Sequence, residues 1–429
     1  MLVHMHSGKH SAWAESTPLG KPEYSAEYAA GVFQTVTTVM AECVLGQEIG
    51  SGEELQARLA HFKGNMFARG ALDNAWWALQ SVITQTPLYQ LVGGVQPEIE
   101  VGEALGLSQW DDGKGVEQLL QKVGAAFDKG FARVKLKFVK EHGLQMLDAV
   151  RARFPTEVFH IDCNSSLSLA ADREMLLALD KYELAMIEQP LSADDVLDHA
   201  ELARLIKTPV CLDESLQGKD RARQALAASS CSIFNIKPAR CGGLTVSLQI
   251  ADLARRAGVP CWIGGMLESG IGLEFQRALA TLDVCSMPAE AGGYSHDINP
   301  DPSGGWAVRR DLWRCALLLL SSDTAQRWRV RTGAQPRCRG GGNDRGRDDG
   351  LPRQRQRRVH PRHGDAALCR ARPGHAREVH GREVVSARPS GVALAGARAR
   401  AGGRRGGSPG DNATRRVTLR TTRTPYRYE

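Results

Sequence analysis

Five short apolar segments decide the fold of this 429-residue chain: FARVKLK (131–137), VFHID (158–162), LAMIE (184–188), VCLD (210–213) and SIFNIK (232–237). Each segment ends on a charged residue, and these residues stand 24 to 26 positions apart: Lys137, Asp162, Glu188, Asp213 and Lys237. Buried strands that recur between helical stretches are typical of parallel βα units. The spacing therefore predicts a closed (β/α) barrel.

The charged residues at the strand ends predict a metal site. In a (β/α) barrel the carboxyl ends of the strands converge on one mouth, so Asp162, Glu188 and Asp213 are expected to meet there. Three crowded carboxylates need a cation, and oxygen ligands suit Mg²⁺, with Mn²⁺ as an alternative. Any one of these residues alone would be interpreted as a solvated charge. Five in register favour a common site flanked by Lys137 and Lys237.

The rest of the chain divides into three predicted parts: a partial capping domain over 1–95, the catalytic barrel over 96–310 and a basic low-complexity tail over 311–429. Helices are predicted over 21–48, 52–63 and 65–85, a first barrel strand over 98–106, and a helix over 244–257 that ends at Gly258. Pro260 precedes a seventh strand, 261–263, which leads into the glycine-rich segment 264–270.

Six motifs carry a resemblance: KLK (135–137), IDCN (161–164), IEQPL (187–191), LDES (212–215), NIKPARCGG (235–243) and GGMLESGIG (264–272). In this order and spacing they resemble the enolase superfamily, in its mandelate racemase and muconate-lactonizing-enzyme-like part. Within it they are closest to the branch containing o-succinylbenzoate synthase and N-succinylamino acid racemase. The resemblance runs from about residue 12 to about residue 282. It implies a (β/α)₇β barrel with an N-terminal α+β capping domain.

The resemblance also implies roles for individual residues. Lys137 would be the base that abstracts a proton, and Lys237 would lie across the substrate. Lys135 lies two residues before Lys137 on the same strand, so the two side chains face the same way. The positive charge of Lys135 is expected to lower the pKa of Lys137 and so favour its neutral form. Residues with a predicted substrate-binding or supporting role are Asn164, Glu214, Glu268 and Ser269. We interpret His160 as structural and expect it to point away from the mouth.

The expected chemistry is Mg²⁺-dependent removal of a proton next to a carboxylate, giving an enediolate. As the synthase, the protein would dehydrate its substrate in menaquinone biosynthesis. As the racemase, or a related cycloisomerase or epimerase, it would use the two lysines on opposite faces of the substrate. The motifs do not separate these activities. A hypothesis of another class is an inactive remnant whose basic tail binds polyanions.

Both ends of the chain depart from the family pattern. We expect only one strand of the capping sheet, His10–Glu15, with its edge unpaired. Residues 321–429 contain 26 Arg, no Lys and nine Asp or Glu, so the rest of the chain is acidic although the whole carries +7. We interpret this tail as disordered or frame-shifted, with the break in similarity between Leu282 and Leu320.

Composition sets the remaining expectations. The ten cysteines form no CxxC pair, which favours reduced core thiols in a cytoplasmic protein. No signal peptide or membrane-spanning segment is evident. The expected partner is a small-molecule carboxylate substrate rather than a membrane or nucleic acid. Proteins of the family that the chain resembles form oligomers, so the resemblance is compatible with a homo-oligomer.

Overall fold

The computed structural model describes residues 1–96, 98–106, 115–291, 329–331 and 417–422, all within one compact unit. The strands are β1 Leu2–Ser7, β2 His10–Glu15, β3 Glu98–Glu100, β4 Gly102–Leu105, β5 Arg133–Lys137, β6 Phe159–Asp162, β7 Ile187–Glu188, β8 Val210–Leu212, β9 Ile233–Ile236, β10 Cys261–Ile263, β11 Arg329–Arg331 and β12 Val417–Thr422. The α-helices are α1 Ala29–Thr35, α2 Gly52–Leu59, α3 Met66–Thr84, α4 Leu88–Leu91, α5 Gly115–Asp128, α6 Gly143–Arg153, α7 Arg173–Ala178, α8 Val196–Leu205, α9 Lys219–Ala228, α10 Pro238–Cys241, α11 Leu244–Ala257 and α12 Gly270–Ala280.

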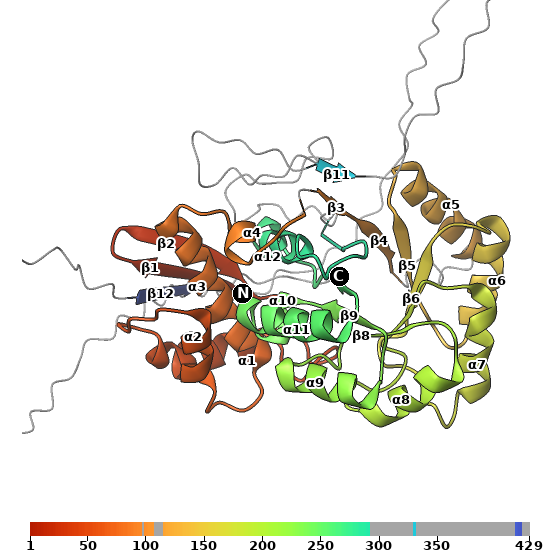
Figure 1. The fold of residues 1–429 in the computed structure, drawn as a ribbon, viewed down its shortest axis with the longest axis horizontal. Coiled ribbons are helices and arrows are strands. Elements are labelled where there is room, and N and C mark those ends of the chain that lie inside the picture. The colour runs from red at the N-terminus through yellow and green to blue at the C-terminus, as the bar shows by residue number, and fades with distance from the viewer. Residues whose placement is uncertain (97, 107–114, 292–328, 332–416, 423–429) are drawn as a thin grey trace, which may run out of the picture. The chain divides into compact units, whose positions relative to one another are not determined.

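Seven parallel strands form the barrel sheet, in the order β10-β9-β8-β7-β6-β5-β4. Figure 1 shows helices α5 to α9 on the outer side of these strands. The strands are buried on both faces, as expected for apolar segments covered by helices outside and by packed side chains inside. The predicted (β/α) barrel class is confirmed.

The barrel ring closes through a short segment after α12. Ala289 N–H donates to Glu100 O at 2.9 Å, Gly102 N–H donates to Ala289 O at 3.0 Å, and Glu290 N–H donates to Ile263 O at 2.8 Å. Ala289 and Glu290 therefore occupy the eighth position, between β10 and the first barrel strand. Barrel structure continues to Ala291, which lies within the range Leu282–Leu320 predicted for the break in similarity. The tail predicted as disordered lies outside the described residues, except for β11 and β12.

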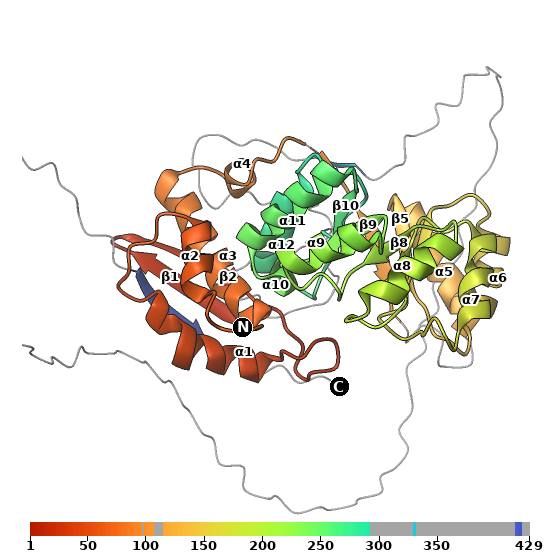
Figure 2. The same ribbon diagram turned by 60° about the horizontal axis from the view of Figure 1, so that its bottom comes forward.

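The sheet of the capping domain has three strands, in the order β12-β1-β2. Figure 2 shows β1 and β2 beside helix α3. The prediction of one remaining strand with an unpaired edge is therefore wrong. In β1, Val3 and Met5 face the core and alternate with His4 and His6, which is the pattern of a half-covered strand. β12 pairs along the other edge of β1, from Leu2↔Thr422 to Ser7↔Val417.

The predicted helix over 21–48 is only partly correct. α1 begins at Ala29 and passes at Val36 into a π-helical turn, Val36–Met40, and a 3-10 turn, Ala41–Cys43. The hydroxyl of Thr38 donates to Gln34 O at 2.8 Å, and such bonds compete with the regular helical pattern. α3 and α11 match their predicted ranges closely, and Gly258 ends α11 with φ +69°.

The cysteines in the described part of the chain are all free thiols, and six of these seven are buried, as predicted for core thiols. Inside the barrel a small cluster of Met186, Cys211, Ile233 and Trp262 lies among the parallel strands. The described helices include none long and apolar enough to cross a membrane.

Candidate metal centre and active site

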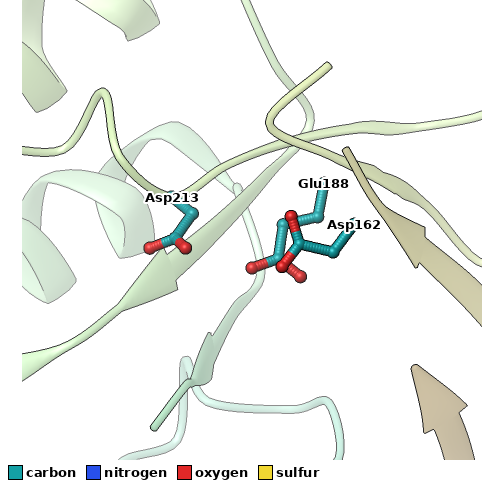
Figure 3. A group of neighbouring side chains, drawn as sticks. All are labelled: Asp162, Glu188 and Asp213. Carbon is teal, nitrogen blue, oxygen red and sulfur yellow. The ribbon is translucent and has the colours of Figure 1, made fainter. Parts of the chain in front are cut away.

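Three carboxylates converge at the carboxyl ends of neighbouring barrel strands (Figure 3). Asp162 ends β6 and is in register with Glu188, which ends β7, and Asp213 follows β8 directly. One oxygen from each lies within 4.8 Å of the others, and all three side chains are buried. The sequence therefore predicted correctly which acids meet.

Lys135 lies among these acids. Its Nζ is 2.9 Å from Asp162 Oδ2, 3.0 Å from Glu188 Oε2 and 3.2 Å from Glu290 Oε1. Burial alone would lower the pKa of Lys135, but these carboxylates outweigh it, so the pKa lies well above its ordinary value. Lys135 is thus primarily an ion-pair partner of the acids.

The other two lysines lie at opposite ends of the acidic cluster. Lys137 Nζ is 2.7 Å from Asp162 Oδ2 and donates to Asn164 Oδ1 at 2.5 Å. Lys237 Nζ is 2.9 Å from Asp213 Oδ2. The side chain of Lys137 is 29% exposed, whereas Lys237 is buried. The predicted placement of two ammonium groups flanking three carboxylates agrees with this geometry.

The charges of the site are unevenly balanced. Burial and the neighbouring Asp162 raise the pKa of Glu188 to about 8. Burial opposes ionisation of Asp213, yet Lys237 and Arg240 outweigh it and hold its pKa far below the ordinary value. Lys135 therefore compensates the charge of Glu188 only in part, whereas Lys237 and Arg240 neutralise Asp213 well.

The donor set fits a hard divalent cation. Three buried carboxylates supply only oxygen atoms, which is the ligand chemistry of Mg²⁺. Close by, Glu214 Oε2 is buried and has no hydrogen-bond partner among the described residues. Burial and the charge of Asp213 raise the pKa of Glu214 well above its ordinary value. A cation bound by Asp162, Glu188 and Asp213, the acidic triad, would offset the negative charge around Glu188 and Glu214.

Asn164 connects two of the predicted site residues. Besides accepting from Lys137, it donates through Nδ2 to Glu214 Oε1 at 2.9 Å. Its backbone has φ +42°, a conformation that asparagine tolerates better than most residues. Asn164 thus fixes the Lys137 side chain beside the triad, and Glu214, which follows β8, supports Asn164.

Glu268 and Ser269 are buried beneath the capping domain. Glu268 folds back so that Oε2 accepts from Met266 N–H at 2.6 Å. Ser269 caps α12 and donates through Oγ to Glu15 Oε2 at 2.9 Å. These contacts favour a supporting role over direct substrate contact for both residues.

His160 points into the barrel, so the prediction that it faces away is wrong. It stands two residues before Asp162, and strand residues two apart share a face. Its Nε2 lies 3.1 Å from Glu188 Oε2, and its ring centroid is 5.5 Å from that of Trp262. Burial lowers its pKa well below the ordinary value, which keeps the imidazole neutral.

Three residues at the site were not predicted individually. Arg240 Nη2 is 3.0 Å from Asp213 Oδ1, and Tyr24 donates to the same oxygen at 3.1 Å. Glu290 completes the surroundings of Lys135 from the eighth barrel position. Tyr24 lies in the capping domain before α1, and no sequence signal singled out Glu290.

Glu268 supplies a test of the electrostatics around the seventh strand. Burial raises its pKa to about 7 from an ordinary value of 4.5. The folded protein therefore favours the protonated form, so this contribution to stability is present below pH 4.5 and is lost as the pH rises through 7. The shift corresponds to about 3 kcal/mol. Glu268→Gln should remove this loss between pH 5 and 8 in urea unfolding.

The matched control is Glu117→Gln on the exposed face of α5, which should leave the pH dependence of stability as it is in the wild type. If Glu268→Gln and the wild type lost stability in parallel between pH 5 and 8, Glu268 would not be held in its protonated form by the fold.

A parallel barrel with an α+β cap and three acids at successive strand ends defines a class of metal-dependent enzymes. Residues 118–312 match the family model described as enolase C-terminal domain-like. The N-succinylamino acid racemase of Thermus thermophilus is 40% identical over 274 residues, which are 64% of this chain and 73% of that protein. The o-succinylbenzoate synthase of Geobacillus kaustophilus is 38% identical over 286 residues, which are 67% of this chain and 75% of that protein.

Among solved structures, an enolase-superfamily protein from Enterococcus faecalis V583 is 33% identical with a TM-score of 0.61, covering 66% of this chain and 74% of its own. The chain belongs to the enolase superfamily.

Proposed function

We propose that this protein catalyses divalent-metal-dependent abstraction of a proton next to a carboxylate, with a small-molecule carboxylic acid as substrate. The observation that carries the proposal is the placement of Lys137 and Lys237 at opposite ends of the acidic triad. A substrate bound at the triad would have one amine on each side. The names of the relatives support the same class of chemistry.

Asp162, Glu188 and Asp213 would hold the ion, with Mg²⁺ as the first candidate and Mn²⁺ as the second. When bound, such an ion supplies electrostatic stabilisation of negative charge on the substrate carboxylate. Lys135 bridges two of the three ligands at 2.9 and 3.0 Å and keeps their side chains in place. His160 and Asn235 orient Glu188, and Asn235 Nδ2 donates to its Oε1 at 2.7 Å.

Lys137 would remove the proton and Lys237 would face the anion that forms. A base must be neutral before it accepts a proton and must then return that proton to water. The 29% exposure of the Lys137 side chain allows this exchange, and Asn164 Oδ1 accepts from its Nζ. Lys237 is enclosed by Asp213, Tyr24 and Met266, surroundings that favour a fixed cation.

This asymmetry supports o-succinylbenzoate synthase as the first candidate. In that dehydration one lysine abstracts the α-proton and delivers a proton to the β-hydroxyl, which leaves as water, while the second lysine stays charged. The reaction would belong to menaquinone biosynthesis. The second candidate is N-succinylamino acid racemase, supported by the 40% identity to the Thermus thermophilus enzyme, in which both lysines would exchange protons.

Incubation in D₂O with Mg²⁺ tests the proposal. The synthase should dehydrate its cyclohexadiene carboxylate substrate, followed by loss of ultraviolet absorbance. The racemase should incorporate deuterium at the α-carbon of N-succinyl amino acids of either hand, followed by proton NMR. Dehydration without α-exchange would exclude the racemase, and α-exchange without dehydration would exclude the synthase. Absence of both reactions with Mg²⁺ or Mn²⁺ would contradict the proposed function.

A further inference from the structure

We propose that Glu15, a residue of the capping domain, is a positioning residue for the active-site loop Gly264–Ser269, which follows the seventh barrel strand. The inference rests on the proposed function, because its consequence is for the lysines that would carry the reaction. Glu15 ends β2 and is buried although it is acidic. Nothing in the sequence motifs singles it out.

The carboxylate of Glu15 gathers three donors at one oxygen. Its Oε2 accepts from Ser269 N–H at 2.8 Å, from Ser269 Oγ at 2.9 Å and from Gly272 N–H at 3.0 Å. All three donors lie at the beginning of α12, where free N–H groups and the helix dipole favour a negative charge. The strand β2 is thereby fastened to the end of the loop Gly264–Ser269.

The contact leaves no room for a side chain at Gly272. A Cβ there would lie 2.6 Å from Glu15 Oε2 and 2.5 Å from Glu268 Cγ. The close approach requires glycine, so the sequence of α12 is adapted to receive this carboxylate. Glu15 is therefore part of a tightly packed junction and not an incidental surface contact.

The loop that Glu15 fastens contains a residue in an unfavourable conformation. Leu267 has φ +62°, a region that a branched side chain rarely adopts, and it is 45% exposed at the rim. Such a conformation persists only when its surroundings hold it. The bond from Met266 N–H to Glu268 holds one side of the bend, and Glu15 holds the other side through Ser269.

The same loop touches the groups around the reacting centre. Met266 Sδ lies 3.7 Å from Lys237 Nζ. Gly265 N–H donates to Glu290 Oε2 at 3.1 Å, and Glu290 pairs with Lys135. A relaxed loop would remove the sulfur from Lys237 and free the Glu290 side chain. Glu15 thus acts on the lysines through the loop, without touching them.

A second junction between the cap and the barrel supplies a matched control. Asp73 in α3 accepts from Thr245 N–H at 2.9 Å, at the beginning of α11. Its other oxygen accepts from Gln56 Nε2 at 2.9 Å. Asp73 and Glu15 are both buried cap carboxylates at the start of a barrel helix, but the hydrogen bonds of Asp73 do not reach the loop Gly264–Ser269.

The experiment compares Glu15→Gln and Glu15→Ala with Asp73→Asn and Asp73→Ala in the full chain. Amide hydrogen exchange of residues 264–269 should be at least about 10-fold faster in Glu15→Ala than in wild type, and unchanged in both Asp73 variants. The kcat of Glu15→Ala should fall about 10- to 100-fold, with Mg²⁺ affinity within about 3-fold of wild type. Glu15→Gln keeps an acceptor oxygen and should recover most of the rate.

Leucine-to-glycine replacement at position 267 tests the mechanism, because glycine adopts positive φ without strain. In a Leu267→Gly background, Glu15→Ala should lower kcat less than it does in the wild-type background. Equal losses in both backgrounds would contradict a role in holding Leu267. Unchanged exchange in residues 264–269, or equal losses of kcat in Glu15→Ala and Asp73→Ala, would overturn the proposal. The exchange measurement needs no turnover, so an inactive wild type would contradict only the proposed function.

Discussion

Lys137→Ala should lower the rate of α-proton abstraction by roughly 10³-fold or more, because general-base catalysis by a positioned side chain contributes 10² to 10⁴. Among the described residues, no other exposed amine contacts Asp162, so no neighbouring side chain can take over proton abstraction from Lys137. The affinity for Mg²⁺ should stay close to that of the wild type, because Asp162 keeps its second ammonium partner, Lys135. Rates are measured by deuterium incorporation or dehydration, and affinity by calorimetry.

The matched control is Lys140→Ala. Lys140 follows the same strand, is 48% exposed and pairs with Asp172, which is not part of the triad, so its loss removes a positive charge without touching the triad. Its rate should stay within about 2-fold of wild type. Turnover retained by Lys137→Ala would show that the base has been assigned to the wrong residue.

Glu188→Gln should weaken Mg²⁺ binding by more than roughly 100-fold and abolish turnover, because it removes one of the three proposed anionic ligands. Gln is close to Glu in size, so packing against Asn235 and His160 is retained and the loss reports on charge. With Glu188 neutral, Lys135 still has Asp162 and Glu290 as partners, which should keep the variant folded. Calorimetric titration with Mg²⁺ and circular dichroism measure these two properties.

Glu214→Gln tests whether the metal ligands have been identified correctly as Asp162, Glu188 and Asp213. Glu214 is also buried and follows Asp213 directly, but it bonds to Asn164 and does not belong to the group of converging oxygens. Its substitution should change Mg²⁺ affinity by less than about 3-fold. A loss equal to that of Glu188→Gln would mean that Glu214, and not only the triad, binds the ion.

The acidic triad could be predicted because its position depends on strand order alone. Once five strands run parallel in sequence order, their carboxyl ends must lie side by side, and register places Asp162 beside Glu188. The ion pair between Arg240 and Asp213 could not be predicted, because it depends on how the short helix α10 turns after β9. Glu290 was missed because its segment is too short to show a strand pattern.

The capping domain was harder to predict than the barrel. β1 alternates apolar and polar residues, but a short segment at the start of the chain that contains two histidines is also typical of a flexible terminus. β12 could not be predicted, because its partner β1 is more than 400 residues away and strand pairing over such a separation leaves no local signal. The junction at Glu15 was missed for a similar reason, since Ser269 is 254 residues away in the sequence.

The most direct test of the central claim is anomalous X-ray diffraction from crystals grown with Mn²⁺, a stand-in for Mg²⁺ that can be located by its own scattering. We predict one peak enclosed by Asp162, Glu188 and Asp213, at about 2.1 Å from an oxygen of each, with the amines of Lys137 and Lys237 on opposite sides. A crystal with no peak at the three carboxylates, or with the ion bound elsewhere, would contradict the account.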